Sequence, residues 1–167
     1  MITSVTMAMI IVAMEPGTEQ IVLVPAYVLT WTVLHEGAHA GAASLSGREV
    51  TSFRPYPHVA RGAFAMGSTE YTGQRSGFVS VAPYMMDMAI FVASDLAIDN
   101  VDESRKFWLV SLMACALVDV AWNYAVAIDG RSQSDFAPWA DKRLVVGIGG
   151  AAIVLATMRL VDRVREL

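Results

Sequence analysis

The stretch QIVLVPAYVLTWTVLHEGAHAGAASL, residues 20–45, places two histidines and a glutamate inside a long apolar run. A helix of this length could cross the hydrocarbon core of a bilayer, which needs about 20 residues. Ionisable side chains within such a run are expensive to bury and usually serve a function. The pentapeptide HEGAH at residues 35–39 therefore indicates a functional site within a helix that could cross a membrane.

The composition of the chain favours a membrane protein. Of its 167 residues, 55% are hydrophobic and 17% are charged, whereas soluble domains contain about 25% charged residues. The net charge of −4 and the lack of a basic patch interleaved with aromatic residues argue against a nucleic-acid partner. The single cysteine, Cys115, excludes an internal disulfide framework. The length suits one membrane-embedded domain over residues 1–167.

Four long apolar runs predict the architecture. They cover residues 20–46, 80–98, 107–128 and 143–161, and each is long enough to cross a bilayer as a helix. We therefore expect an all-α, multi-pass membrane bundle with the lipid bilayer as its surroundings. Residues 2–14 form a shorter apolar segment, and whether it also spans is left open. Pro83 is expected to mark the start of the second long helix.

The connection between the first two runs, residues 47–79, predicts a small β-structure. Its stretches Glu49–Phe53 and His58–Met66 lack a helical period and are separated by glycine turns, which favours short strands or a hairpin. His58–Met66 could offer an edge to an extended substrate, or it could be a plain loop. If all four runs cross, seven of the 12 lysines and arginines lie on the side of this connection, so the positive-inside rule predicts that it is cytoplasmic.

HEGAH itself has the H-E-x-x-H pattern of zinc enzymes. His35 and His39 share one face of a helix because they are four residues apart, so both could bind the same metal ion. Glu36 lies next to that face, where it could act as the general base on a water molecule. The alternative is a purely structural pair of interior histidines bonded to neighbouring carbonyl groups.

A catalytic zinc site needs a third protein ligand, and depth within the bundle favours Asp119. If the first helix ends near residue 46, His39 lies about 10 Å and His35 about 16 Å from that end. Asp119 lies about 13–14 Å from the corresponding end of the third run. With neutral histidines, Zn²⁺ and the carboxylates of Asp119 and Glu36 sum to zero charge.

Other residues could serve in place of Asp119 or beside it. Asn123 follows it by one helical turn and could bind the substrate carbonyl, orient a ligand, or only form an interhelical hydrogen bond. The alternative third ligands are Asp129, Asp87, Asp95, His58 and Glu70. Of these, Asp129 begins a polar loop and would require that loop to fold inward.

These features resemble the site-2 protease type of intramembrane zinc metalloprotease, over about residues 20–130. The resemblance implies a Zn²⁺ cofactor bound by His35 and His39, with Glu36 as the catalytic base. It implies peptide-bond hydrolysis in membrane-protein or peptide substrates, within or near the membrane. In that family the third ligand usually lies in an Asn-x-x-Pro…Leu-Asp-Gly motif. Here Asp129-Gly130 has the Asp-Gly pair, whereas Asp119 is followed by Val120, so both aspartates stay open at this point.

A second reading of the same residues is a membrane zinc-binding protein, or a membrane metalloenzyme without proteolytic activity. A glutamine in place of Glu36 would distinguish these readings, because it should keep the metal and remove cleavage. The oligomeric state is not predicted by the sequence.

Overall fold

The computed structural model describes residues 18–60, 63–74, 76–128 and 143–167. These residues form two compact units, one ending at Met86 and the other beginning at Asp87. The apolar segment 2–14 and the polar loop containing Asp129 lie outside the described residues. The expectation of a single domain over the whole chain stays a prediction.

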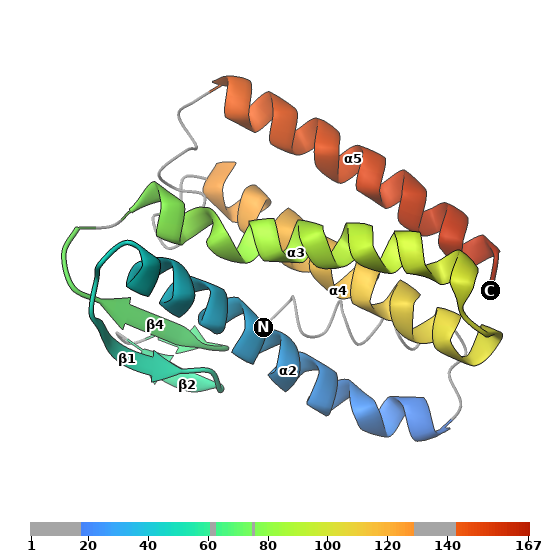
Figure 1. Ribbon diagram of the computed structural model, residues 1–167, viewed down its shortest axis with the longest axis horizontal. Coiled ribbons are helices and arrows are strands. Elements are labelled where there is room, and N and C mark those ends of the chain that lie inside the picture. The colour runs from blue at the N-terminus through green and yellow to red at the C-terminus, as the bar shows by residue number, and fades with distance from the viewer. Residues whose placement is uncertain (1–17, 61–62, 75, 129–142) are drawn as a thin grey trace. The chain divides into compact units, whose positions relative to one another are not determined.

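All four apolar runs form helices (Figure 1). These are α2 (Thr18–Leu45), α3 (Gly77–Ala97), α4 (Glu103–Ile128) and α5 (Arg143–Arg165), and the short 3₁₀ helix η1 (Ile98–Asn100) follows α3. Two segments among the described residues, Gly77–Asn100 and Glu103–Ile128, are long and apolar enough to cross a membrane. The predicted mostly helical architecture is therefore confirmed, while membrane crossing by all four helices stays a prediction.

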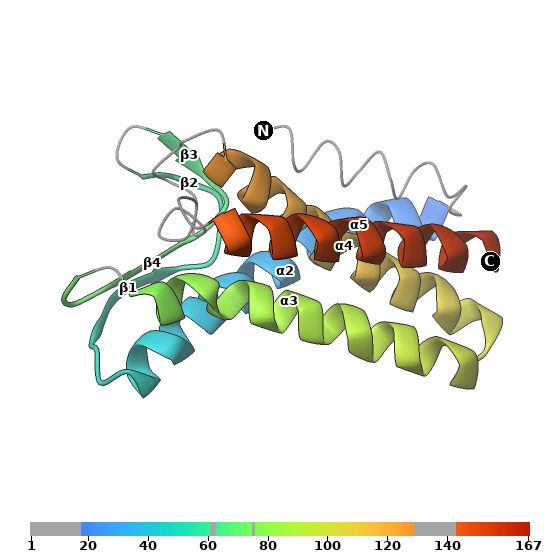
Figure 2. The same cartoon turned by 90° about the horizontal axis from the view of Figure 1, so that it is seen from above.

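The connection after α2 forms short strands, as predicted, and these pair into two small antiparallel sheets. Strand β1 (Val50–Arg54) pairs with β4 (Ser68–Tyr71), and β2 (His58–Ala60) pairs with β3 (Ala63–Ala65). Figure 2 shows the β2–β3 pair as an excursion from the longer β1–β4 pair. The Ser68 hydroxyl bonds to Nε2 of His58 at 2.9 Å, so a side-chain contact ties β2 to β4.

The unit that ends at Met86 packs around the end of α2. Ala42, Ala43 and Val79 are buried there, and the small alanine side chains let α3 approach closely. Val50, Tyr71 and Ala82 pack against this cluster from the β1–β4 sheet and from α3. The helix ends where Gly47 adopts a φ of 70°, a left-handed conformation that glycine tolerates. The sheet is thereby held against α2 close to HEGAH.

The expected helix start at Pro83 is wrong, because α3 begins at Gly77 and contains Pro83 in its interior. Proline is tolerated in the first helical turn, where the backbone N–H has no helical partner in any case. Pro83 lies beyond that turn, so the bond that an N–H at this position would donate to the carbonyl of Val79 is missing. The helix therefore begins six residues before the proline that was expected to mark its start.

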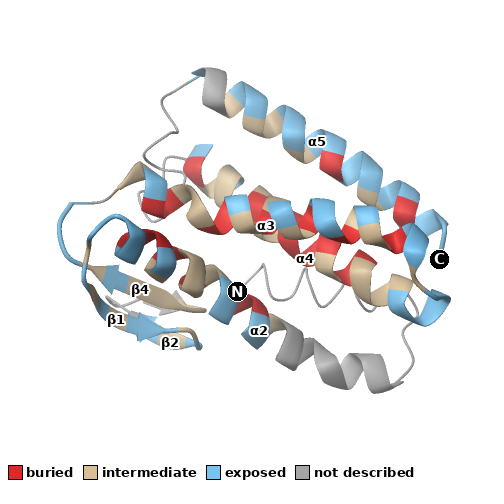
Figure 3. Cartoon of the chain, in the orientation of Figure 1, coloured by how far each residue is buried: buried red, intermediate tan, exposed pale blue. Residues whose placement is uncertain are grey.

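In the unit that begins at Asp87, helix α4 packs against α5. A Cβ atom on Gly149 or Gly150 would lie 2.9 Å from the Tyr124 side chain, so these glycines allow the close approach. The Tyr124 hydroxyl donates a hydrogen bond to the carbonyl of Val146. Figure 3 shows buried positions grouped along α4 and largely exposed ones along α5.

The start of α4 is capped by Asp102. Its Oδ1 accepts a hydrogen bond from the backbone N–H of Arg105 at 3.1 Å, the usual N-cap arrangement. The Ser104 hydroxyl donates to the same oxygen at 2.6 Å. This bond is the main cause of the lowered pKa of Asp102.

The far end of α5 carries a charged cluster centred on Arg163, whose side chain is 5% exposed. Its guanidinium donates to Asp95 at 2.6 Å, to Asp99 at 2.8 Å and to Glu166 at 2.7 Å. Arg159 adds a second contact to Asp95 at 2.9 Å. These pairs join α5 to the end of α3 and to η1.

Candidate metal centre and catalytic glutamate

Helix α2 brings His35 and His39 onto one face, one turn apart. The centroids of their rings are 5.1 Å apart, with an interplanar angle of 76°. Two imidazoles bound to one tetrahedral zinc at about 2.0–2.1 Å would have centroids about 5 Å apart. The two rings therefore fit a shared metal ion.

His39 is fixed in the tautomer that a metal ligand needs. Its side chain is buried, and Nδ1 lies 2.8 Å from the carbonyl oxygen of Val79 in α3. Because a carbonyl oxygen can only accept, Nδ1 carries the hydrogen and donates it. In the neutral ring the lone pair then lies on Nε2. Metal-bound histidines usually donate their other ring N–H to a carbonyl or carboxylate in this way.

His35 is half-buried and is oriented by an aromatic neighbour. Its ring meets the ring of Tyr84 edge-on, with centroids 6.1 Å apart and an interplanar angle of 83°. Tyr84 itself is only 3% exposed. The first half of α3 thus contacts both histidines of the motif, through the Val79 carbonyl and the Tyr84 ring.

Glu36 is buried and is held by strand β4. The Thr69 hydroxyl lies 2.8 Å from Oε2 of Glu36 and 3.0 Å from its backbone oxygen, and one hydrogen can serve either acceptor. A Cβ atom on Gly67 would lie 2.6 Å from Cγ of Glu36 and 2.7 Å from the Thr32 methyl group. Only a glycine leaves room for the chain to pass this close to the glutamate.

Gly67 and Thr69 were not among the residues singled out from the sequence. Thr69 is an ordinary strand residue, and Gly67 is an ordinary turn residue just before that strand. Their importance depends on the docking of β4 against α2, and the sequence pattern carries no signal for that docking.

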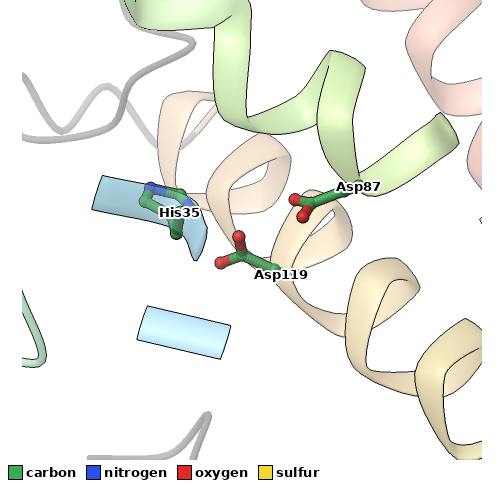
Figure 4. A group of neighbouring side chains, drawn as sticks. All are labelled: His35, Asp87 and Asp119. Atoms are coloured by element: carbon green, nitrogen blue, oxygen red, sulfur yellow. The ribbon is translucent and has the colours of Figure 1, made fainter. Parts of the chain in front are cut away.

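In the unit that begins at Asp87, two carboxylates lie close together. Oxygen atoms of Asp87 in α3 and Asp119 in α4 lie within 4.8 Å of one another. Figure 4 shows both side chains directed into the space between α3 and α4, and it also draws His35, which belongs to the other unit. Asp87 is fully buried. Two carboxylates this close repel one another unless a cation or a shared proton lies with them.

The side chain of Asn123 contacts Asp119. Its side-chain N–H₂ lies 3.1 Å from the backbone oxygen of Asp119 and 3.1 Å from Oδ1. The spacing of four residues in the sequence anticipated this contact. Of the roles considered for Asn123, orientation of a ligand is the one that this geometry favours.

The other candidate ligands are engaged elsewhere or are not described. Asp95 belongs to the Arg163 cluster. His58 donates from Nδ1 to the carbonyl of Tyr56 at 2.8 Å and accepts from Ser68 at Nε2. Glu70 is exposed. Asp129 lies outside the described residues, so the structure does not compare it with Asp119.

A helical chain with two segments able to cross a membrane and a buried H-E-x-x-H motif is typical of the membrane-embedded peptidase class. The model of one family, described as Peptidase M50B-like, matches residues 2–127. The chain belongs to this peptidase family, which confirms the resemblance to site-2 proteases. Searches of curated proteins and of solved structures gave no match. Family membership and the two apolar segments together indicate a membrane protein.

Proposed function

We propose that this protein is an intramembrane zinc metalloprotease that hydrolyses peptide bonds of membrane-embedded substrates. The observation that carries the proposal is the state of the H-E-x-x-H motif in an M50B-like chain. His39 donates from Nδ1 to a carbonyl and so keeps Nε2 for a metal, while Glu36 is buried and oriented. A purely structural pair of histidines would not require the adjacent glutamate to be held in this way.

In this proposal the zinc ligands are His35, His39 and Asp119. The family match covers Asp119 and ends at residue 127, before Asp129. The sequence supports this set, because His35, His39 and Asp119 lie at similar distances, about 10–16 Å, from the ends of their apolar runs by helix rise. Asn123 orients the Asp119 carboxylate. The nearby Asp87 carboxylate adds to the negative field that favours a cation.

We further propose that α2 to α5 all cross the membrane and that the connection 47–79 lies on the cytoplasmic side. Large apolar side chains face outward on α3 and α5, among them Leu96 at 70%, Leu155 at 66%, Ile148 at 62% and Met158 at 61% exposure. Apolar surface of this extent is costly in water and suits contact with lipid chains. The distribution of basic residues supports the orientation.

The chemistry divides between the cofactor and the chain. Bound zinc would supply Lewis-acid activation of the attacking water and of the scissile carbonyl. Glu36 would take the proton of that water on a carboxylate oxygen and deliver it to the leaving amine. Thr69 holds this carboxylate through its hydroxyl. Gly67 leaves the space that the carboxylate occupies.

The substrate is proposed to bind as an extended strand. A peptide bond within an intact helix is covered by neighbouring turns, so the substrate must unwind locally before attack. The small sheets beside α2 could receive it by strand addition, in which backbone hydrogen bonds supply the affinity. The strand β4 passes directly over Glu36, so a peptide paired with this region would lie close to the general base.

The proposal is tested by Glu36→Gln in purified protein reconstituted in lipid nanodiscs. Zinc content is measured by elemental analysis, and cleavage is measured with a labelled transmembrane peptide of helix-destabilising sequence. We expect the variant to keep its zinc and to lose about 10²–10⁴-fold in cleavage rate, the usual contribution of a general base. Glu49→Gln, which changes an exposed glutamate of the same unit, should alter neither. Zinc binding by the wild type without cleavage of any peptide would favour the non-proteolytic alternative.

A further inference from the structure

Helix α3 contains a proline in its interior. Pro83 lies beyond the first turn of the helix, where proline removes a backbone hydrogen bond and costs stability. An interior helical proline is one of the least favourable residues by propensity. Its side chain is fully buried, so its position is set by the packing of this unit.

The carbonyl affected by this proline is that of Val79. In a regular helix the N–H of residue 83 would donate to the carbonyl oxygen of residue 79, and proline has no N–H to donate. This is the same oxygen that accepts the hydrogen bond from Nδ1 of His39 at 2.8 Å. The two facts involve one atom, and both belong to the unit that ends at Met86.

We propose that Pro83 is a positioning residue for the metal ligand His39, because it frees the Val79 carbonyl to accept the histidine N–H. The freed oxygen is a buried acceptor that must find a donor, and the His39 ring supplies it. The bond fixes the hydrogen on Nδ1 and aims Nε2 away from α3. The proline thus converts a loss of helix stability into control of the tautomer and the orientation of one ligand.

Tyr84 positions the other histidine of the motif, His35. It follows Pro83 directly and contacts the His35 ring edge-on, so one short segment of α3 orients both rings. The inference about Pro83 rests on the proposed zinc site for its purpose. The hydrogen bond itself exists without metal and can be tested without it.

The experiment compares the wild type with Pro83→Ala and with Pro55→Ala, a proline outside the helices. The first readout is the ¹⁵N spectrum of the imidazole groups in the metal-free protein. The chain has only three histidines, so single replacements assign them. We expect His39 to hold its hydrogen on Nδ1 in the wild type and in Pro55→Ala. In Pro83→Ala, where the new N–H competes for the Val79 carbonyl, both tautomers should be populated.

The second readout is zinc affinity, measured by competition with a chelating dye. Loss of an outer-shell partner of a metal-binding histidine weakens metal binding by about 10–100-fold, and we expect about tenfold for Pro83→Ala. The melting temperature should rise or stay the same, because alanine is the better helix former. A merely structural proline would give a change in stability with no change in the His39 spectrum.

The outcomes separate this inference from the proposed function. An unchanged His39 spectrum in Pro83→Ala overturns the role of Pro83, whatever the zinc affinity. A changed spectrum in a protein whose wild type binds no zinc upholds the positioning role and overturns the proposed zinc site. A changed spectrum with tenfold weaker zinc binding supports both.

Discussion

Two groups of acidic residues in the unit that begins at Asp87 differ in what surrounds them. At the end of α5, Arg163 and Arg159 face three carboxylates, and Arg163 binds Asp95 and Asp99 through short contacts. Nearer the start of this unit, the carboxylates of Asp87 and Asp119 face each other within 4.8 Å. The first group brings its own cations, whereas the second combines two like charges.

The presence or absence of a neighbouring cation helps to distinguish structural from functional ionisable groups in an apolar setting. A cluster that nearly neutralises itself can join helices without any ligand, although removal of one member exposes the others to a desolvation cost. A close pair of carboxylates is stable only with a proton or a cation nearby. The first kind of cluster should therefore affect stability when it is changed, and the second kind should affect metal binding.

The largest effect should come from Asp119→Ala, which tests the second cluster. Removal of the proposed third ligand should weaken zinc binding by orders of magnitude and abolish cleavage, because a catalytic site needs three protein ligands. Zinc content and peptide cleavage are measured as for Glu36→Gln. The melting temperature of the metal-free protein should change little or rise, since one of two facing carboxylates is removed.

The matched control is Asp129→Ala, which changes the aspartate of the Asp-Gly pair. It should leave zinc binding and cleavage nearly intact. The assignment is wrong if Asp129→Ala loses zinc while Asp119→Ala retains it. Asp87→Asn gives a further comparison, because it keeps the volume of the neighbouring side chain and removes its charge.

The sequence predicted the helices and the individual candidates, but not how they combine. The i and i+4 spacing of His35 and His39 was sufficient to predict a shared face, and the same spacing predicted the contact between Asp119 and Asn123. The closeness of Asp87 and Asp119 depends on the rotation of α3 and α4 about their axes. Apolar runs without a strong polar face do not specify that rotation.

The contacts of Glu36 and His39 escaped prediction for a related reason. Thr69 and the Val79 carbonyl reach these side chains from segments 33 and 40 residues away along the chain. Such contacts depend on tertiary packing and have no local pattern. Pro83 was visible in the sequence, but its usual association with helix starts led to the wrong boundary.

The next effect in size should come from Arg163→Ala, which tests the first cluster. Removal of Arg163 leaves the largely buried Asp95 with Arg159 as its remaining cation, and breaking a buried pair costs roughly 3 kcal/mol. For a chain of this size we expect the melting temperature to fall by roughly 6 °C or more. Zinc affinity measured well below the transition should be unchanged.

The control for this variant is Arg165→Ala. Arg165 is exposed and lies 3.7 Å from Asp162, and exposed pairs contribute about 0–1 kcal/mol. A loss of zinc affinity in Arg163→Ala at low temperature would contradict the view that the Arg163 cluster affects stability alone. Equal changes in melting temperature for the two arginine variants would show that the Arg163 cluster is not a structural clamp.

The smallest effect should come from Thr69→Val, which tests the contact of Glu36. This buried carboxylate accepts its hydrogen bond from a neutral hydroxyl, unlike the carboxylates that bind Arg163 and unlike the pair Asp87 and Asp119. Thr69→Val keeps the β-branched shape that suits a strand and removes only the hydroxyl that bonds to Oε2. A hydrogen bond to a charged group contributes about 1.5–3 kcal/mol in total. Water that enters near the scissile bond can replace part of it, so we expect cleavage to fall about tenfold, with zinc content unchanged.

Thr69→Ser is the sharper comparison, because it keeps the hydroxyl and removes the methyl group. It should retain most of the activity, and the difference between the serine and valine variants then measures the hydrogen bond alone. If the serine variant loses activity and the valine variant does not, packing of the methyl group is what matters, and the Thr69 hydroxyl does not orient the base. If neither loses activity, Glu36 needs no partner from β4, and the space left by Gly67 is sufficient to position it.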